Sequence, residues 1–451
     1  MNTQSSAAHP FSWISVFGPL LFLAAISVVV VRADHKRSQP GEIVDSRFDS
    51  AQGYRDFHNA IYFPVRALIS GVNPYSKEYV DSYHPDQLGF PPFAPSSVLL
   101  HVPLGFLTVG AAEIAYLIIN ISLLIFICWF SVRKTSYPYV VGAVFMLAAM
   151  MVISRPGLLN FLGLQMTLLL VVGTLLALEY SESNPVLSGF GLLLACCKPT
   201  YVIPLAVIML FRRNFSAFAV GVLLCGLVNV GAIWMIASQN EGVENFVSEV
   251  TDVYQVDAPV EVPEVPKVRT SWSRVDVYSI VARWVDVSEM KYLSIWISLG
   301  VLAIGALFTI MEIDPEHRTG VNSRTGLLAI LVMLTSIYHQ PYDCLVLWIP
   351  LAALLLGDLK AIDGFSSVSR FLLVMLLMIP MVNFVSTKMA LDRMGIDDGI
   401  SSVPQGFAME QFLHVWPWKL AVTFNGIALL LATAIVVMAI LRNWDHQRVP
   451  I

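Results

Sequence analysis

The polar stretch YRDFHNAIYFPVRALISGVNPY, residues 54–75, follows the first long apolar run and concentrates side chains that can do chemistry. Asp56 is its candidate general base. A carboxylate can take a proton from a hydroxyl group, and partial burial raises the pKa of such a group toward working pH. Aspartate is also among the best residues at a helix N-cap. Both interpretations of Asp56 remain open, because capping and catalysis do not exclude each other.

Further polar side chains in this stretch recur every four residues. His58, Tyr62 and Arg66 are predicted to share one helix face, although Pro64 must kink or end that helix. They are candidate substrate contacts, and a solvated interfacial helix with an aromatic belt explains the same spacing. Gly71 is predicted to end the helix in left-handed geometry, and the NPY that follows to form a turn.

Lys198 lies in the segment CCKPT, between the apolar runs 186–197 and 199–211. A proline disfavours α conformation in the residue before it, so the helix should break at Lys198. An intramembrane lysine costs about 2.5–3.5 kcal/mol on insertion scales. Either it snorkels from a helix end, or it meets a phosphate or carboxylate. Gln165, in the run 162–179, is a candidate hydrogen-bonding residue of a cavity wall or an interhelical contact.

A second polar group is predicted in the short connection within TSIYHQPYDCLVLW. His339 and Asp343 there can form a proton relay, a phosphate site or a metal site, or His339 is a satisfied loop residue. A single His–Asp pair is weak support for a metal, and no second cluster completes a site, so neither metal nor cofactor is expected. Arg274, in KVRTSWSRVDVYSIVARW, can hold an anionic head group or simply be solvated.

The composition defines the class of protein that must position these residues. Of 451 residues, 56% are hydrophobic and 13% charged, and the mean hydropathy is +0.69. A soluble domain needs more charge, so we expect an all-α polytopic membrane protein. The net charge of −5 includes no basic block, which argues against a nucleic-acid partner. The five cysteines show no ligand or disulfide spacing.

About 12 apolar runs are expected to be transmembrane helices within a single membrane domain, residues 1–451. The first run is interpreted as an uncleaved anchor, since no small-residue cleavage site follows it. Three polar loops, 33–110, 238–290 and 387–417, are predicted on one outer face. The first of them should carry interfacial helices, including one near 94–107.

The short connections on the other side are rich in lysine and arginine, and the positive-inside rule therefore assigns them to the cytoplasm. The segment RADHKR points the other way, but it opens a loop of about 60 residues, near the length where the rule weakens. The basic residues of the short connections are Arg133, Lys134, Arg212, Arg213, Arg318, Arg324, Lys360, Arg370, Arg442 and Arg448.

Several stretches in order resemble glycosyltransferase family 87, the polyprenol-phosphate-mannose-dependent α-mannosyltransferases of the GT-C fold. RDFHNAIYFPVRALISGVNPY is similar to the family's first signature, and FPPFAPSSVLLHVPLGFL to its Tyr-Pro-Pro segment. LGLQMTLLLVVGTLLAL, GFGLLLACCKPTYVIPLAVIMLFRR and SIYHQPYDCLVLWIPLAALL resemble three later blocks. The chain departs from the pattern at Leu164 and Thr167, where the family has Gly and Asn, and at Phe90, where it has Tyr.

The resemblance implies an inverting hexosyltransferase, with mannose as the expected sugar and a polyprenyl-phosphate carrier as donor. The acceptor would be a lipid or a glycan, and the site would face the extracytoplasmic side of the plasma membrane. Asp56 would occupy the position of the catalytic base, with His339 and Lys198 where a lipid phosphate could bind. The family pattern needs no metal or cofactor.

Two other classes of function remain. A transporter or flippase of lipid-linked or anionic substrates would also use a broken helix and an intramembrane lysine. Such proteins often show internal repeats, and we find none in this sequence. They also rarely have long polar loops gathered on one side of the membrane. A structural or assembly protein would not require Lys198 or the polar helix at 54–70.

Overall fold

The computed structural model describes most of the chain in seven stretches. These are residues 13–38, 54–83, 93–238, 242–248, 274–356, 362–386 and 416–448, except 136, 138, 286, 288, 289, 291, 313, 315–317 and 364. The described residues form helices and turns without strands. Together with six described helices that are long and apolar enough to cross a membrane, this confirms the prediction of a helical polytopic membrane protein.

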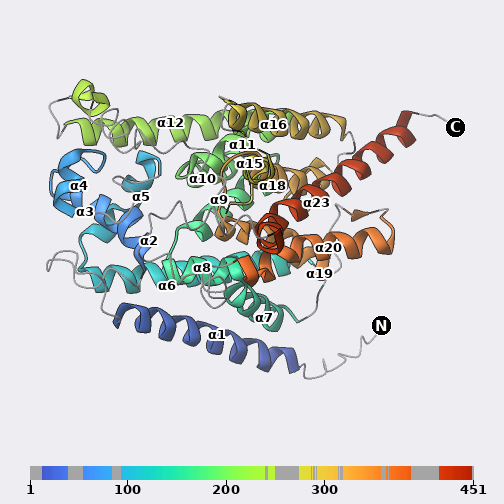
Figure 1. Ribbon diagram of the computed structural model, residues 1–451, viewed down its shortest axis with the longest axis horizontal. Helices are drawn as coiled ribbons and strands as arrows, with labels where there is room; N and C mark the ends of the chain where they lie inside the picture. The colour runs from blue at the N-terminus through green and yellow to red at the C-terminus, as the bar shows by residue number, and fades with distance from the viewer. Residues whose placement is uncertain are drawn as a thin grey trace, which may run out of the picture.

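Long apolar helices make up the outside of the molecule. Six of them in the described stretches are long and apolar enough to cross a membrane, and most of their side chains are not buried inside the protein. They are α1 (Trp13–Ser38), α6 (Val109–Arg133), α12 (Phe215–Ser238), α16 (Leu293–Met311), α20 (Ser367–Val382) with the turn η4 (Phe384–Ser386), and α23 (Trp416–Arg448). In Figure 1, α12 and α16 lie along the top and α1 along the bottom.

Short apolar helices fill the space between these long ones. They are α9 (Thr167–Glu179), α10 (Pro185–Cys196), α11 (Pro199–Phe211), α18 (Arg324–Ser336), and η2 (Pro341–Leu347) continued by α19 (Trp348–Leu355). Every residue of α18 is buried. A helix of this length is about 20 Å long, whereas the hydrocarbon core of a bilayer is about 30 Å thick.

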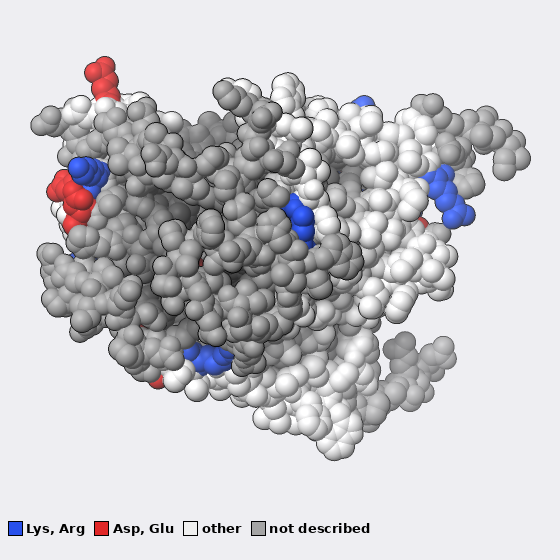
Figure 2. All heavy atoms as spheres, in the orientation of Figure 1, with Lys and Arg blue, Asp and Glu red and all other residues white. Residues whose placement is uncertain are grey.

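The count of about 12 spans expected from the sequence included these short runs. The described helices support six spans by length and composition. A seventh is possible if α7 (Val140–Ile153) and α8 (Arg155–Gly163), which are bent by 76° at Ser154, form one broken span. In Figure 2, the described surface at the lower right, around α7, shows no charged side chains, as a lipid-facing surface requires.

The first polar loop folds into short helices at the left end of Figure 1. They are α2 (Arg55–Phe57), η1 (His58–Tyr62), α3 (Phe63–Ile69), α4 (Lys77–Tyr83) and α5 (Pro95–Gly105). The segment predicted near 94–107 is thus α5, which with 11 residues is too short to cross a bilayer. Of the loop 238–290, the structure describes 242–248 and α15 (Val277–Trp284), and the loop 387–417 lies almost wholly outside the described residues.

Local sequence rules explain where the site-bearing helices begin and end. Pro64 follows a π-helical segment, η1, and does not end the helix, which runs on to Ile69. Gly71 then has a φ of +81°. The NPY turn is closed because the Asn73 side chain accepts from the Tyr75 N–H at 2.9 Å. Both predictions for the end of this helix are confirmed.

The predicted break at Lys198 is also confirmed. α10 ends at Cys196 and α11 begins at Pro199, with Lys198 between them in extended conformation at φ −126° and ψ 109°. The break turns the lysine side chain toward the protein interior, where only 8% of its surface is exposed.

Candidate functional site

Asp56 is an exposed carboxylate held by a neighbouring helix end. Its Oδ2 accepts a hydrogen bond from Gln165 Nε2 at 2.7 Å. A Cβ added to Gly163 would lie 2.4 Å from the same oxygen, so any larger residue at this position would push the carboxylate aside. The structure therefore brings together two residues that are 109 positions apart in the chain.

The bend between α7 and α8 carries Gln165 to this place. Ser154 caps α8 by accepting from the Gly157 N–H at 3.2 Å, and α8 ends at Leu164 in left-handed conformation, with φ 51° and ψ 55°. A non-glycine residue in that region costs roughly 1–2 kcal/mol. Leu164 is fully buried, which compensates for the backbone strain with apolar contacts.

Lys198 meets a carboxylate rather than solvent. Its Nζ donates to both oxygens of Asp343, at 2.8 Å and 2.7 Å, and the carboxylate is completely buried. Asp343 also accepts from the Tyr201 hydroxyl at 3.1 Å and from the Gln340 N–H at 2.9 Å. An isolated buried charge is costly, whereas one with this many donors is well compensated.

His339 completes what we call the buried charge cluster: Lys198, Asp343 and His339. Its Nδ1 lies 3.1 Å from Asp343 Oδ2, and its Nε2 lies 3.2 Å from the carbonyl oxygen of Thr200. Both ring nitrogens thus face oxygen acceptors. The imidazole can place positive charge beside the carboxylate only if both nitrogens carry protons.

Tyr342 joins the buried charge cluster to the exposed carboxylate. Its ring centroid is 5.1 Å from Lys198 Nζ, and its hydroxyl lies within electrostatic range of Asp56. Tyr201 packs on the other side, with its ring edge-on to His339 at 5.1 Å between centroids. Neither tyrosine was chosen from the sequence, although Tyr201 stands three residues after Lys198, which is the spacing of neighbours on one helix turn.

Arg274 reaches the same region from the start of α15. It makes a two-pronged ion pair with Asp276, with distances of 2.9 Å and 3.0 Å, and its guanidinium stacks 4.7 Å from the ring centre of Tyr338. The Val275 N–H donates to the His339 carbonyl at 3.1 Å, which fixes the two loops together. The side chain of Arg274 remains 13% exposed.

The other three candidates make their polar contacts with the α5–α6 corner. His58 Nε2 lies 2.8 Å from Glu113 Oε1, Tyr62 donates to the Leu107 carbonyl at 2.9 Å, and Arg66 donates to the Gly105 carbonyl at 2.8 Å. The successive partners show that the three side chains share one face, as their spacing predicts.

The polar helix is therefore anchored to this corner through His58, Tyr62 and Arg66. Burial raises the pKa of Tyr62, an effect that Arg66 opposes, so the hydroxyl stays protonated and can donate to the carbonyl. These contacts orient the helix that carries Asp56.

The described stretches contain no group of three or more His, Cys, Asp or Glu side chains that could together bind a metal ion.

Comparison with known proteins gives one match. A family model described as glycosyltransferase family 87 matches residues 91–337, more than half of the chain. The matched range contains Gln165, Lys198 and Arg274; it begins after Asp56 and ends just before His339. No curated protein and no solved structure matches the chain.

Proposed function

The chain belongs to glycosyltransferase family 87, and from this membership we propose that it moves a hexose from a polyprenyl-phosphate donor to a hydroxyl of a lipid or glycan acceptor. Mannose is the proposed sugar, the transfer inverts the anomeric carbon, and Asp56 is the general base. The proposed fold is of the GT-C type. A membrane glycosyltransferase is what the family match and the apolar helices support directly.

One observation carries the assignment of the site. Tyr342 relates an exposed carboxylate to the buried charge cluster: the Asp56 charge acts on its hydroxyl, and Lys198 Nζ lies 5.1 Å from its ring centre. Transfer from a lipid phosphate needs a base for the acceptor and positive charge for the departing phosphate. The two parts supply these needs from residues far apart in the chain.

In the proposed reaction, Asp56 removes the proton of the acceptor hydroxyl while that oxygen attacks the anomeric carbon. The bond from the anomeric carbon to the phosphate oxygen breaks, and the polyprenyl phosphate leaves with the bonding electron pair. Gln165 holds the carboxylate in place through its 2.7 Å hydrogen bond to Oδ2. Fixing a base in this way contributes to the rate by orientation.

Arg274 is the proposed direct partner of the phosphate. Its side chain is 13% exposed, against 8% for Lys198 and 0% for His339, and a guanidinium suits phosphate oxygens. All three cations face carboxylates, Arg274 that of Asp276 and the other two that of Asp343, so only the greater exposure of Arg274 favours it as the direct contact. The buried charge cluster adds net positive charge only when both nitrogens of His339 carry protons. Strong electrostatic stabilisation at a reacting centre commonly comes from such fixed charges.

The proposed orientation puts the site below the outer membrane surface. α18 runs from Arg324 to Ser336, and the buried charge cluster lies just beyond its C-terminal end. A helix of 13 residues is about 20 Å long. If the basic connections lie at the cytoplasmic surface, the cluster is roughly 10 Å short of the far side of a 30 Å core. In that arrangement, the phosphate of a lipid carrier in the membrane could reach a charged site that lies below the membrane surface, because the site is enclosed by protein.

The test is a transfer assay with the purified full-length chain. Radiolabelled polyprenyl-phosphate-mannose and a lipid extract are supplied, and movement of the label from the carrier to another molecule is measured. We expect transfer from this donor and none from a nucleotide sugar. Absence of transfer from any polyprenyl-phosphate hexose by folded protein would overturn the proposal.

The variant Asp56→Asn tests the base. Asn can still accept from Gln165, so folding should be retained, while the rate should fall by about 10²–10⁴-fold. Asp81→Asn is the matched control, because Asp81 is also an exposed carboxylate of the polar loop but lies on α4. Wild-type turnover by Asp56→Asn would overturn the assignment of Asp56 as the base and leave it a structural residue, although the protein would still be a transferase.

A further inference from the structure

A second polar site lies at the other end of the molecule, between α20 and α23. A cavity of about 480 Å³ opens there. It is lined by Arg324, Asp363, Phe365, Ser366, Ser369, Leu372, Ile435, Met438, Ala439, Arg442 and Asn443. Since α18 separates Arg324 from the buried charge cluster by its whole length, this cavity is distinct from the proposed transfer site.

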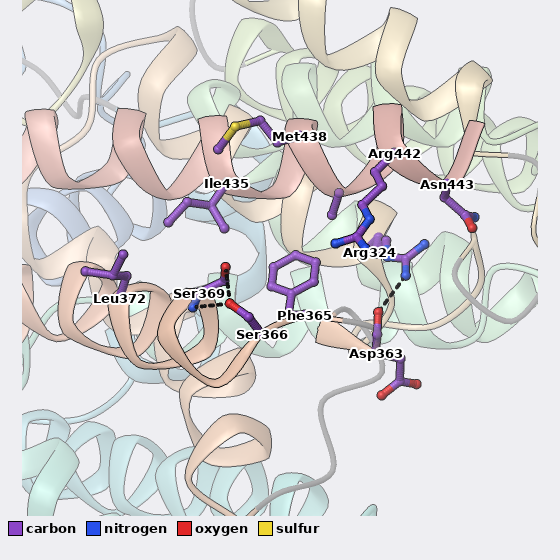
Figure 3. Close-up of a pocket in the computed structure, with 11 residues that line it drawn as sticks. Arg324, Asp363, Phe365, Ser366, Ser369, Leu372, Ile435, Met438, Arg442 and Asn443 are labelled. Carbon is purple, nitrogen blue, oxygen red and sulfur yellow. Dashed lines mark hydrogen bonds between the residues drawn. The ribbon is translucent and has the colours of Figure 1, made fainter. Parts of the chain in front are cut away.

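Two arginines lie close together at one end of the cavity (Figure 3). Arg324 is 5% exposed, donates to the Asp363 carbonyl at 2.9 Å and pairs with Glu312 at 3.3 Å, yet its buried Nε has no hydrogen-bond partner. Arg442 is exposed and makes no ion pair within the described stretches. The Asp363 carboxylate points away from both guanidinium groups in Figure 3.

The start of α20 adds hydrogen-bonding groups to the same cavity. Ser366 caps this helix by accepting from the Ser369 N–H at 3.1 Å, and the two hydroxyls lie 3.0 Å apart. The N-terminal end of a helix of 16 residues favours negative charge. Two guanidinium groups, two hydroxyls and a helix N-terminus together fit the oxygens of a phosphate ester.

The rest of the cavity wall is apolar and continues onto the outer surface of the molecule. Leu372 lies at the end away from the arginines, with Ile435 and Met438 along the wall formed by α23 (Figure 3). Leu372 and Met438 are 47% and 59% exposed, and Phe371 beside them is 63% exposed. Such a surface suits hydrocarbon chains and does not suit a free, fully hydrated anion.

We propose that this cavity binds the head group of an anionic phospholipid, with its acyl chains along α20 and α23. The phosphate would lie against Arg442 and the guanidinium group of Arg324, and the glycerol oxygens near Ser366 and Ser369. Basic pockets between transmembrane helices on the cytoplasmic side are known to hold anionic lipid head groups. The site would anchor α23 to α20 at the end of the protein opposite the transfer site.

The test uses the delipidated full-length chain in detergent and native mass spectrometry. Phosphatidylglycerol, phosphatidylcholine and glycerol 3-phosphate are titrated separately. We expect one tightly held phosphatidylglycerol, weaker phosphatidylcholine, and glycerol 3-phosphate too weak to displace the lipid. Equal affinity of glycerol 3-phosphate and phosphatidylglycerol would overturn the lipid assignment.

Two variants locate the binding. Arg442→Gln should lower phosphatidylglycerol affinity by about fivefold to tenfold, since one charge-assisted contact to phosphate is lost. Ser369→Leu should lower it by filling the cavity without changing charge. Arg370→Gln is the control, because Arg370 is an exposed arginine of α20 outside the cavity lining. Unchanged affinity in both test variants, or equal loss in the control, would overturn the proposed position.

Discussion

The two ends of α11 hold buried cations in opposite ways. At the first end, Lys198 precedes the helix and is bound by the Asp343 carboxylate. At the other end, Arg212 follows the helix and donates through Nε and a terminal nitrogen to the Arg318 carbonyl, at 3.0 Å and 2.6 Å. Arg318 in turn donates to the Arg212 carbonyl.

The helix dipole makes this difference informative. A cation near a helix C-terminus is stabilised by the dipole, and here the Arg318 side chain satisfies the Arg212 carbonyl at the end of α11. A cation at the N-terminus is disfavoured, and burial adds to the cost. The helix dipole therefore favours Arg212 at its position and disfavours Lys198, which is stabilised by Asp343.

The largest expected effect comes from breaking the Lys198–Asp343 pair. Lys198→Met leaves a buried carboxylate without its main partner, which should lower stability by about 3–5 kcal/mol. Thermal unfolding of the purified chain in detergent measures this. Lys198→Met combined with Asp343→Leu should lose less than the sum of the two single variants. If the losses were additive, the two residues would not act as a pair.

Moving Asp56 without changing its chemistry should come next in size. In Gly163→Ala the new methyl group would displace the carboxylate, which lies 2.4 Å from the added carbon. A misplaced base should lower kcat by about 10- to 100-fold, with KM and the unfolding temperature little changed. Gly231→Ala is the control, because a Cβ there meets nothing within 4 Å. Equal kcat in the two variants would contradict the proposed role of Asp56.

A substitution at the C-terminal end of α11 should change stability but not the transfer rate. Arg212→Met removes the donors to the Arg318 carbonyl and should cost about 1–2 kcal/mol of unfolding free energy. The transfer rate per folded molecule should stay at the wild-type value, since this residue lies a helix length from the cluster. Arg213→Gln, at an exposed neighbouring position, should change neither quantity. A selective loss of kcat in Arg212→Met would remove the contrast between the two ends.

The smallest effect is expected for an exposed pair among the basic connections. Lys134 Nζ lies 2.5 Å from Glu179 Oε1, but the lysine side chain is 46% exposed. Lys134→Gln should therefore lower stability by less than about 1 kcal/mol, and by less still at high salt. Unfolding curves at low and high ionic strength measure this. A loss comparable with that of Lys198→Met would show that burial is not what separates the two pairs.

Some features of the site follow from the sequence alone because they depend on adjacent residues. Pro199 determines the break at Lys198, and Gly71 determines the end of α3, since each acts on the backbone next to it. Hydropathy likewise identifies a helical membrane protein. It cannot separate helices that span a bilayer from short ones enclosed by others, because both are apolar on all sides. That is why about 12 spans were expected and six are supported.

The tertiary structure decided the partners. Lys198 and Asp343 are 145 positions apart, and Gln165 and Asp56 are 109 apart, so no local pattern relates them. His58 and Asp56 are near neighbours in the chain, yet His58 contacts Glu113 while Asp56 contacts Gln165. The residue types capable of chemistry can be read from the sequence. Which of them face one another depends on how the buried helices pack, because packing alone sets the distances between segments remote in the chain.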